Sequence, residues 1–365
     1  MKNYSELTVS TPGRVCLFGE HQDYLNLPII AGAISLRVNI EGNKRGDNLI
    51  NIQLPDINDK EIFPLELPIK YDRERDYFKS AINVLNRNGY TFSNGFDCTV
   101  SGKIPINAGT SSSSALIIAW VNFLTQMSDQ SRKISAEEIA YFAYAAEVLE
   151  FAEPGGMMDQ YSTAVGGIIF LESSPMVKVE RINASLGEFV LGDSQEPKDT
   201  KFILARVKNQ IQSVTKELKN KYPEFSLQNI GINEIGRFTK DLNKEQIELL
   251  EGTIKNRDIT IKAKKILLKS PVNHKEIGHM LTEHQTILRD ILKISTPKID
   301  RMIDAALKAG AFGAKINGSG GGGCMFAYAP QNTNEVKLAI EKEGGKGYII
   351  HVDQGTHSSV LEATE

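Results

Sequence analysis

The chain has 365 residues, of which 41% are hydrophobic and 24% charged, and its formal net charge is −3 at pH 7. A chain of this length exceeds the usual size of one hydrophobic core, which predicts two domains that share a cleft. The mixed charge and a pI near 6.2 exclude a general attraction to nucleic acid or to an anionic membrane.

Cysteine usage and hydropathy indicate the compartment. Cys16, Cys98 and Cys324 are an odd and widely separated set, which predicts neither a disulfide framework nor a zinc site. The opening residues lack the apolar core of a signal peptide, and no stretch approaches the roughly 20 apolar residues of a membrane span. We therefore expect a protein of the reducing cytoplasm.

The first half of the chain mixes strands and helices. Alternating polarity over 96–100 predicts a half-buried strand. The continuous apolar run 115–124 predicts a buried helix whose first turn lies in the serine residues before it. Ser135 and Glu138 form a capping box that opens a second helix, and 167–171 is typical of a returning strand.

The second half is predicted to be richer in helices. It should begin with a strand at Lys201–Val207 and continue with charged amphipathic helices over about 208–310. The elements expected after them are two strands around a glycine tract, a helix and a last strand, at 312–317, 324–329, 334–342 and 348–352. The polar, turn-like residues 196–199 place the boundary near 180–200, which gives domains 1–190 and 191–365.

A glycine followed by small hydroxyl residues precedes the buried helix at 107–114 (NAGTSSSS). The first N–H groups of a helix have no intrahelical partner, so together with the helix dipole they favour a polyphosphate. Serine hydroxyls add donors and can ligate Mg²⁺. No lysine follows the glycine, so this is not the usual P-loop pattern. A polar turn that caps a buried helix would explain the same residues.

A second glycine-rich segment lies at 317–324 (NGSGGGGC). Glycine loses more conformational entropy on folding than any other residue, so a simple turn would not require so many. Close approach of the backbone to a ligand or to another loop would explain them, and a flexible hairpin is the alternative.

A third segment, 11–24 (TPGRVCLFGEHQDY), places Arg14 ahead of an apolar strand and a polar cluster after it. Glu20, His21 and Asp23 supply acceptors and a switchable donor, which suits a polyol whose hydroxyls must each be paired. A surface loop with a structural ion pair is an equally good interpretation of these residues alone.

Taken together and in this order, the three segments resemble the signature motifs of the GHMP kinases, the family of galactokinase, homoserine kinase, mevalonate kinase and phosphomevalonate kinase. The segment 19–24 (GEHQDY) is similar to the galactokinase signature, normally GEHTDY, and 155–160 (GGMMDQ) to the galactokinase stretch that ends in Met-Asp-Gln. The resemblance spans nearly the whole chain. It is closest to galactokinase-like sugar 1-kinases.

The resemblance implies an α+β fold of two domains. The N-terminal domain would be like the second domain of ribosomal protein S5 and would carry the phosphate loop. The C-terminal domain would be a ferredoxin-like α/β sandwich that closes the cleft.

The resemblance also implies the site residues. Asp159 would accept or orient the proton of the acceptor hydroxyl, and Arg14 would keep Asp159 ionised and neutralise charge on the phosphoryl group. Ser113 and Glu147 would ligate Mg²⁺, with Glu150 and Glu153 as competitors of Glu147. The residues expected to bind the acceptor are Glu20, His21, Asp23 and Gly156. Those expected to bind ATP are Asn107, Gly109, Thr110, Ser111, Ser112, Ser113, Ser114, Gly318, Ser319 and Gly320.

The implied activity is transfer of a phosphoryl group from Mg-ATP to the anomeric hydroxyl of galactose or a closely related sugar. Gln22 stands where the signature has threonine, Thr110 stands where leucine is typical, and the C-terminal motif is closer to that of mevalonate kinase and heptose-phosphate kinases. Another acceptor, such as arabinose, a uronic acid, N-acetylgalactosamine or a heptose phosphate, is therefore the first alternative. A sensor that binds sugar and ATP without turnover is the alternative of another class. A mevalonate-type acceptor is disfavoured, because an apolar hydroxy acid would not need the polar cluster at 20–23.

Overall fold

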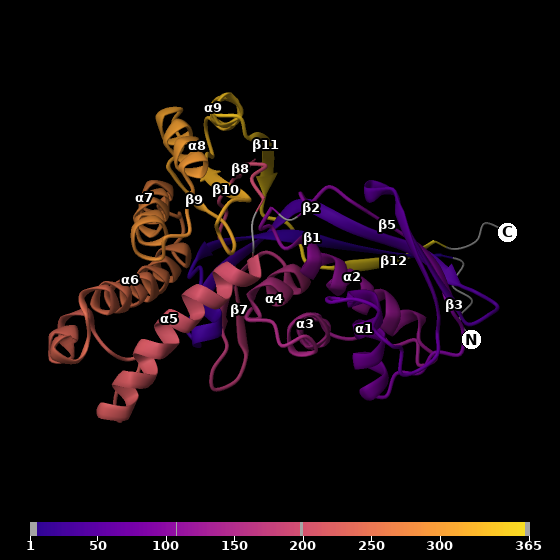
Figure 1. Cartoon of the computed structure of the whole chain (residues 1–365). Helices are drawn as coiled ribbons and strands as arrows, with labels where there is room; N and C mark the ends of the chain where they lie inside the picture. Colours follow the sequence, from indigo (N-terminus) through magenta and orange to yellow (C-terminus); the bar gives the residue numbers. More distant parts are fainter. Residues whose placement is uncertain (1–5, 107, 198–199, 362–365) are drawn as a thin grey trace.

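The computed structural model describes residues 6–106, 108–197 and 200–361, and within them two β-sheets are flanked by helices (Figure 1). The strands are β1 (Glu6–Phe18), β2 (Ile29–Lys44), β3 (Leu49–Leu54), β4 (Asp59–Pro64), β5 (Phe96–Gly102), β6 (Ile168–Glu172), β7 (Lys178–Ile182), β8 (Glu188–Asp193), β9 (Gly313–Ile316), β10 (Cys324–Tyr328), β11 (Lys346–His351) and β12 (His357–Leu361). The α-helices are α1 (Tyr77–Arg87), α2 (Ser112–Met127), α3 (Ala136–Tyr144), α4 (Met158–Val165), α5 (Thr200–Lys221), α6 (Lys244–Leu267), α7 (His274–Thr286), α8 (Pro297–Lys308) and α9 (Thr333–Lys342). The predicted α+β class is confirmed.

The first sheet has the order β12-β1-β2-β5-β3-β4, and β6 and β7 extend it from β2. The pairing of β1 with β2 is antiparallel and contains two register shifts, between Pro12 and Gly13 and between Cys16 and Phe18. Such irregularities bend a strand and re-aim its side chains. Arg14, which the sequence placed ahead of a strand, instead lies inside β1 between these two shifts.

Helices α2 and α4 pack on β1 and β2 of the first sheet, and α1 and α3 pack against these helices and complete the core (Figure 1). The predicted buried helix is confirmed as α2, in which Trp120 is 1% exposed and stacks on Phe123. The predicted capping box is also confirmed at the start of α3. The Ser135 side chain accepts a hydrogen bond from the backbone N–H of Glu138, and the Glu138 side chain accepts one from the backbone N–H of Ser135. At its end α3 runs into a π-helical turn, Ala145–Leu149.

The second sheet is antiparallel with the order β11-β8-β10-β9, and α7, α8 and α9 pack against its strands. The predicted glycine-flanked strands are β9 and β10, and the predicted last helix is α9. β12 comes after this sheet in the chain but pairs with β1 of the first sheet. The division at residue 190 falls inside β8 and stays a prediction.

One predicted element is wrong: Lys201–Val207 is not a strand but the beginning of α5. Its apolar run Phe202–Leu204 suggested a strand, yet Phe202 is 64% exposed. The buried positions of α5 are Val207, Ile211, Val214 and Leu218, which recur at the helical spacing of three or four. Across the described residues, no helix is both long enough and apolar enough to cross a bilayer.

Candidate active site

A cavity of about 370 Å³ lies between the two sheets' loops, and most of the predicted site residues line it. Those that do are Arg14, Glu20, His21, Asp23, Gly109, Ser111, Ser112, Ser113, Ser114, Glu147, Gly156, Asp159, Gly318 and Ser319. Thr110 and Gly320 were predicted for the same site but are not among its lining residues. Asn107 lies outside the described residues.

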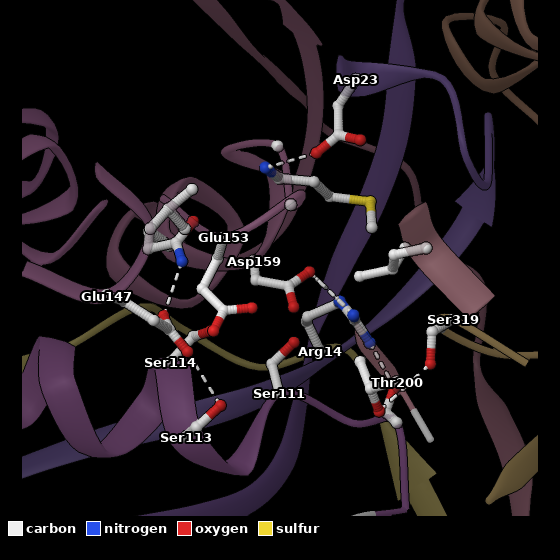
Figure 2. Close-up of a pocket in the computed structure, with 18 of the residues that line it drawn as sticks. Arg14, Asp23, Ser111, Ser113, Ser114, Glu147, Glu153, Asp159, Thr200 and Ser319 are labelled. Atoms are coloured by element: carbon white, nitrogen blue, oxygen red, sulfur yellow. Dashed lines mark hydrogen bonds and ion pairs between the residues drawn. The ribbon is translucent and has the colours of Figure 1, made fainter. Parts of the chain in front are cut away.

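The serine tract forms a strained loop that leads into α2. Gly109 and Ser111 adopt the left-handed conformation, with φ of 87° and 60°. The hydroxyl oxygens of Thr110 and Ser111 are buried, and within the described part of the chain they have no hydrogen-bond partner. Left-handed backbone at a residue other than glycine costs free energy and concentrates at functional sites. The loop therefore presents unpaired donors and the start of a helix to the cavity (Figure 2).

The C-terminal glycine tract packs directly against this loop. Asn317 Nδ2 donates to the carbonyl oxygen of Gly109 at 2.8 Å. A Cβ atom at Gly318 would lie 2.7 Å from that same oxygen, and Gly318 has φ of 79°. Close approach of two backbones explains the glycine here, so the two tracts form one continuous wall of the cavity.

Arg14 and Asp159 form an ion pair at the centre of the cavity, as Figure 2 shows. Nη2 and Nε of Arg14 lie 2.7 and 2.8 Å from Oδ1 of Asp159, and Nη1 donates to the carbonyl oxygen of Gly109. Arg14 is 4% exposed, whereas the Asp159 side chain is 30% exposed toward the cavity. Burial works to lower the pKa of Arg14, but the carboxylates of Asp159 and Glu20 outweigh it and raise that pKa above its usual value.

Glu147 lies in the π-helical turn after α3 and reaches the start of α2. Its Oε1 accepts a hydrogen bond from Ser113 Oγ at 2.8 Å, and its Oε2 accepts one from Gln160 Nε2 at 2.6 Å (Figure 2). Burial raises the pKa of Glu147, and these hydrogen bonds oppose the rise. Glu153, one of the competing carboxylates, also lines the cavity but is held by Arg75 in a two-pronged ion pair.

The oxygen donors of Ser113 and Glu147 suit Mg²⁺, which prefers one or two carboxylates together with phosphate oxygens and water. The described residues contain no group of three or more His, Cys, Asp and Glu side chains that could hold a metal by themselves. Within the described ranges, the hydroxyls of Thr110 and Ser111 and the Oε1 atom of Gln160 are buried without a hydrogen-bond partner. A magnesium ion that arrives with a polyphosphate fits this donor set.

Two residues of the predicted acceptor cluster are bound within the protein. Glu20 Oε2 is 2.7 Å from Nζ of Lys315, and both side chains are buried. Nε2 of His21 is 3.1 Å from the carbonyl oxygen of Ser319, and Nδ1 is 2.8 Å from Tyr24 Oη. A carbonyl oxygen can only accept, so Nε2 carries the hydrogen and Nδ1 accepts from the tyrosine. Burial lowers the pKa of His21 to about 4, which leaves the ring neutral at pH 7.

Asp23 is the half-buried acid of this cluster. Its Oδ2 accepts from the backbone N–H of Met158 at 3.1 Å, and its Oδ1 accepts from that of Tyr24 at 3.0 Å. A Cβ atom at Gly156 would lie 2.0 Å from Oδ2, so only glycine leaves room for the carboxylate there. Burial raises the pKa of Asp23 to about 6, although the Met158 N–H opposes the rise.

The cavity also has lining residues that the sequence did not single out. These are Tyr24, Arg75, Tyr77, Val148, Gly155, Met158, Gln160, Thr200 and Leu204. Gln160 directly follows Asp159 in the Met-Asp-Gln stretch, so this motif could have identified Gln160 as a site residue. Thr200 and Leu204 were missed because the start of α5 was taken for a strand.

Comparisons with known proteins agree with this geometry. Residues 76–167 match the GHMP kinases N terminal domain, residues 268–346 match the GHMP kinases C terminal domain, and residues 2–44 match the galactokinase galactose-binding signature. Mevalonate kinase of Pyrococcus horikoshii is 30% identical over 359 residues, which cover 94% of this chain and 95% of the relative. Galactokinase of Haemophilus influenzae is 26% identical over 356 residues, which cover 91% and 87%.

Among solved structures, Lactococcus lactis galactokinase complexed with galactose superposes with a TM-score of 0.85 at 21% identity, covering 98% of this chain and 96% of that one. This likeness confirms the predicted two-domain fold. The fold and the matched domains define a phosphotransferase whose acceptor is an alcohol group. The chain belongs to the GHMP kinase family.

Proposed function

We propose that the protein is a cytoplasmic kinase that transfers the γ-phosphoryl group of ATP, with Mg²⁺, to the anomeric hydroxyl of galactose or a closely related sugar. The observation that carries the proposal is the Arg14–Asp159 ion pair. It lines one cavity together with the serine loop and the polar cluster of residues 20–24. Phosphoryl transfer depends mainly on alignment and on electrostatic stabilisation, which this arrangement can supply.

The serine loop and the glycine tract form the ATP end of the proposed site. The start of α2 offers backbone N–H groups and a positive dipole end, and the hydroxyls of Ser111 to Ser114 add donors. Gly109 and Gly318 would shape the wall, because larger side chains there would obstruct close approach of the phosphates, and the small side chain of Ser319 lies beside them. Ser113 and Glu147 would hold Mg²⁺, which neutralises phosphate charge when bound.

The central pair would perform the chemical step. The anomeric oxygen of the acceptor forms its bond to the γ-phosphorus as the bond to ADP breaks, and Asp159 receives or orients the hydroxyl proton. Arg14 holds the Asp159 carboxylate in place through the ion pair and offers a permanent positive charge to the transferring group. Because Arg14 is buried and held by Gly109 as well, this charge needs no reorganisation during the reaction.

The acceptor end favours a neutral polyol. Among the described residues that line the cavity, the cations are Arg14 and Arg75, and each is already paired with a carboxylate. Asp23 forms no ion pair with a described residue and accepts from two backbone N–H groups, and its carboxylate suits the hydroxyls of a sugar. We propose that Glu20, Asp23 and Gly156 shape the sugar end. His21 would bind sugar only by giving up one of its two internal hydrogen bonds.

Mevalonate is the second candidate acceptor, because the P. horikoshii relative at 30% identity is a mevalonate kinase. Mevalonate carries a carboxylate, which would need an unpaired cation near the acceptor end. The match of residues 2–44 to the galactose-binding signature and the charges around Asp23 favour the sugar.

A coupled ADP-release assay with Mg-ATP would test the proposal across galactose, its epimers, arabinose, uronic acids, sugar phosphates and mevalonate. We expect turnover with galactose or a near relative. Preferred turnover of mevalonate would overturn the choice of acceptor. Thermal stabilisation by sugar and ATP without release of ADP would indicate a sensor instead.

The variant Asp159→Asn keeps the size of the side chain and removes its charge. We expect a loss of turnover of about 10²–10⁴-fold with little change in sugar affinity, because the carboxylate acts on the proton in transit. Titration of sugar binding by calorimetry would separate the two effects. Unchanged turnover would remove Asp159 from the mechanism.

A further inference from the structure

The orientation of the Glu147 side chain is set by a π-helical turn of the backbone. Helix α3 ends at Tyr144, and the π-helical turn Ala145–Leu149 that follows contains Glu147 at its centre. A π-turn inserts an extra residue and rotates the side chains after it, and such turns are frequent at functional sites. A carboxylate on a turn of this kind needs additional support if it is to hold one orientation.

Gln160 supplies that support from the first turn of α4. Its Nε2 donates to Glu147 Oε2 at 2.6 Å, while Ser113 Oγ donates to the other carboxylate oxygen. Gln160 is 2% exposed, so water does not compete strongly for the amide. The carboxylate is therefore fixed from two sides, by residues on two different helices.

The carbonyl oxygen of the same amide, Oε1, has no hydrogen-bond partner among the described residues. Gln160 lines the cavity, and in the described part of the chain its Oε1 is buried without a hydrogen bond. An unsatisfied buried acceptor destabilises the folded protein. A donor that arrives with the substrate would remove this cost. Water bound to a magnesium ion is a strong donor, and Mg²⁺ usually keeps several waters.

We propose that Gln160 is a positioning residue for the metal. Its Nε2 fixes Glu147, and its Oε1 accepts a hydrogen bond from a water molecule of the bound ion. The inference rests on the proposed function, because it takes Glu147 and Ser113 as metal ligands. Residues that orient a metal ligand in this way typically change metal affinity by about 10–100-fold when they are replaced.

The proposal also explains why the two residues are adjacent. Asp159 and Gln160 occupy the first turn of α4, and they point to Arg14 and to Glu147 respectively. One rigid turn would thus set the distance between the acceptor's proton and the metal that holds the phosphates. Alignment of these two parts is the main requirement of phosphoryl transfer.

The test measures Mn²⁺ binding to the full chain in the presence of a non-hydrolysable ATP analogue, by electron paramagnetic resonance of free Mn²⁺. Four variants are compared with the wild type. Gln160→Met has a similar shape but neither donor nor acceptor, and Gln160→Glu keeps an acceptor but loses the donor. Glu147→Gln reports on the proposed metal site itself. Gln126→Met is the matched control, because Gln126 is a buried, hydrogen-bonded amide on α2 that does not line the cavity.

We expect Gln160→Met to bind Mn²⁺ about 10–100-fold more weakly. Gln160→Glu loses the donor to Glu147 but brings a second carboxylate to the ion, so its affinity for Mn²⁺ should exceed that of Gln160→Met. Binding of the metal-free nucleotide should not change, and raised Mg²⁺ should restore turnover of Gln160→Met. Gln126→Met should match the wild type in all three measurements. If Gln160→Met does not fold, as judged by thermal melting, Gln160→Asn replaces it.

The outcomes separate this inference from the proposed function. If Glu147→Gln weakens Mn²⁺ binding and both Gln160 variants leave it unchanged, Gln160 merely fills space and the inference is overturned. If Glu147→Gln also binds Mn²⁺ like the wild type, the proposed metal site is wrong, and the inference fails with it. Equal weakening by Gln126→Met would trace the effect to general destabilisation and would likewise overturn the role of Gln160.

Discussion

Replacement of Asp23 by asparagine should stabilise the protein while it weakens acceptor binding. The pKa of Asp23 is about 6 in the folded protein, against 3.8 without the surrounding structure. At about 1.4 kcal/mol per pKa unit, ionised Asp23 costs up to about 3 kcal/mol of folding free energy. Two effects reduce this gain: Asp23 is only half-buried, so solvent screens its charge, and asparagine keeps one acceptor oxygen for the two backbone N–H donors. We therefore expect Asp23→Asn to recover about 1–2 kcal/mol.

The sign of the pH dependence is specific. A carboxyl with a raised folded pKa binds more protons when folded between about pH 4 and 6, so stability falls as pH rises through that window. The melting temperature of Asp23→Asn should therefore exceed that of the wild type by about 1–3 °C at pH 7.5, and the gain should vanish near pH 4. Acceptor affinity should drop about tenfold or more at pH 7.5, because a charge-assisted hydrogen bond is lost.

Differential scanning fluorimetry across pH would measure the change in melting temperature, and calorimetric titration would measure the change in acceptor affinity. Asp47→Asn is the matched control, since the hydrogen bond from Arg45 lowers the pKa of Asp47 to about 2. This variant should show no gain at pH 7.5. A melting temperature of Asp23→Asn that is lower than wild type at pH 7.5, or that is shifted equally at every pH, would refute the reasoning about burial.

Two further substitutions test the packing of the site. Gly156→Ala should raise the KM for the acceptor about tenfold or more in steady-state assays, because the new Cβ would displace Asp23, whereas Gly155→Ala should not, since its Cβ would meet only a side-chain carbon at 3.9 Å. Equal effects of the two alanines would contradict this. Lys315→Met should lower stability in urea unfolding by about 3–5 kcal/mol, because it leaves the Glu20 carboxylate buried without its partner. The double variant with Glu20→Gln should recover much of the loss, and an equally unstable double variant would show that the ion pair is not the cause.

The elements of the fold that depend on neighbouring residues could be predicted from the sequence. The capping box of Ser135 and Glu138, the buried helix after the serine tract and the strands around the glycine tract all depend on residues close together in the chain. In each case the short-range pattern and the tertiary environment agree. At Phe202 the short-range pattern and the tertiary environment disagree. The apolar run suggested a buried strand, but the segment is a helix of which only one side packs on the protein, and Phe202 is exposed.

The motifs also identified most of the cavity, but not the partners of its side chains. Glu20 and Lys315 are nearly 300 residues apart in the chain and meet only when the segment that follows β1 packs against β9. The same holds for His21 and the glycine tract. A motif lists which polar groups are present, whereas the contacts across the chain decide which of them are already satisfied.

This distinction bears directly on the choice of acceptor. Of the three polar residues at 20–23 that suggested a sugar, Glu20 has a buried cation beside it and His21 has both ring nitrogens engaged. Among the described residues, the hydrogen-bond donors to Asp23 are backbone N–H groups, and burial raises its pKa, so it gains most from new hydroxyl donors. The discrimination between epimers should therefore be concentrated on the hydroxyls that reach Asp23. An acceptor that places a carboxylate there would bring two negative charges together, and the unfavourable interaction would exclude it more strongly than any missing hydrogen bond.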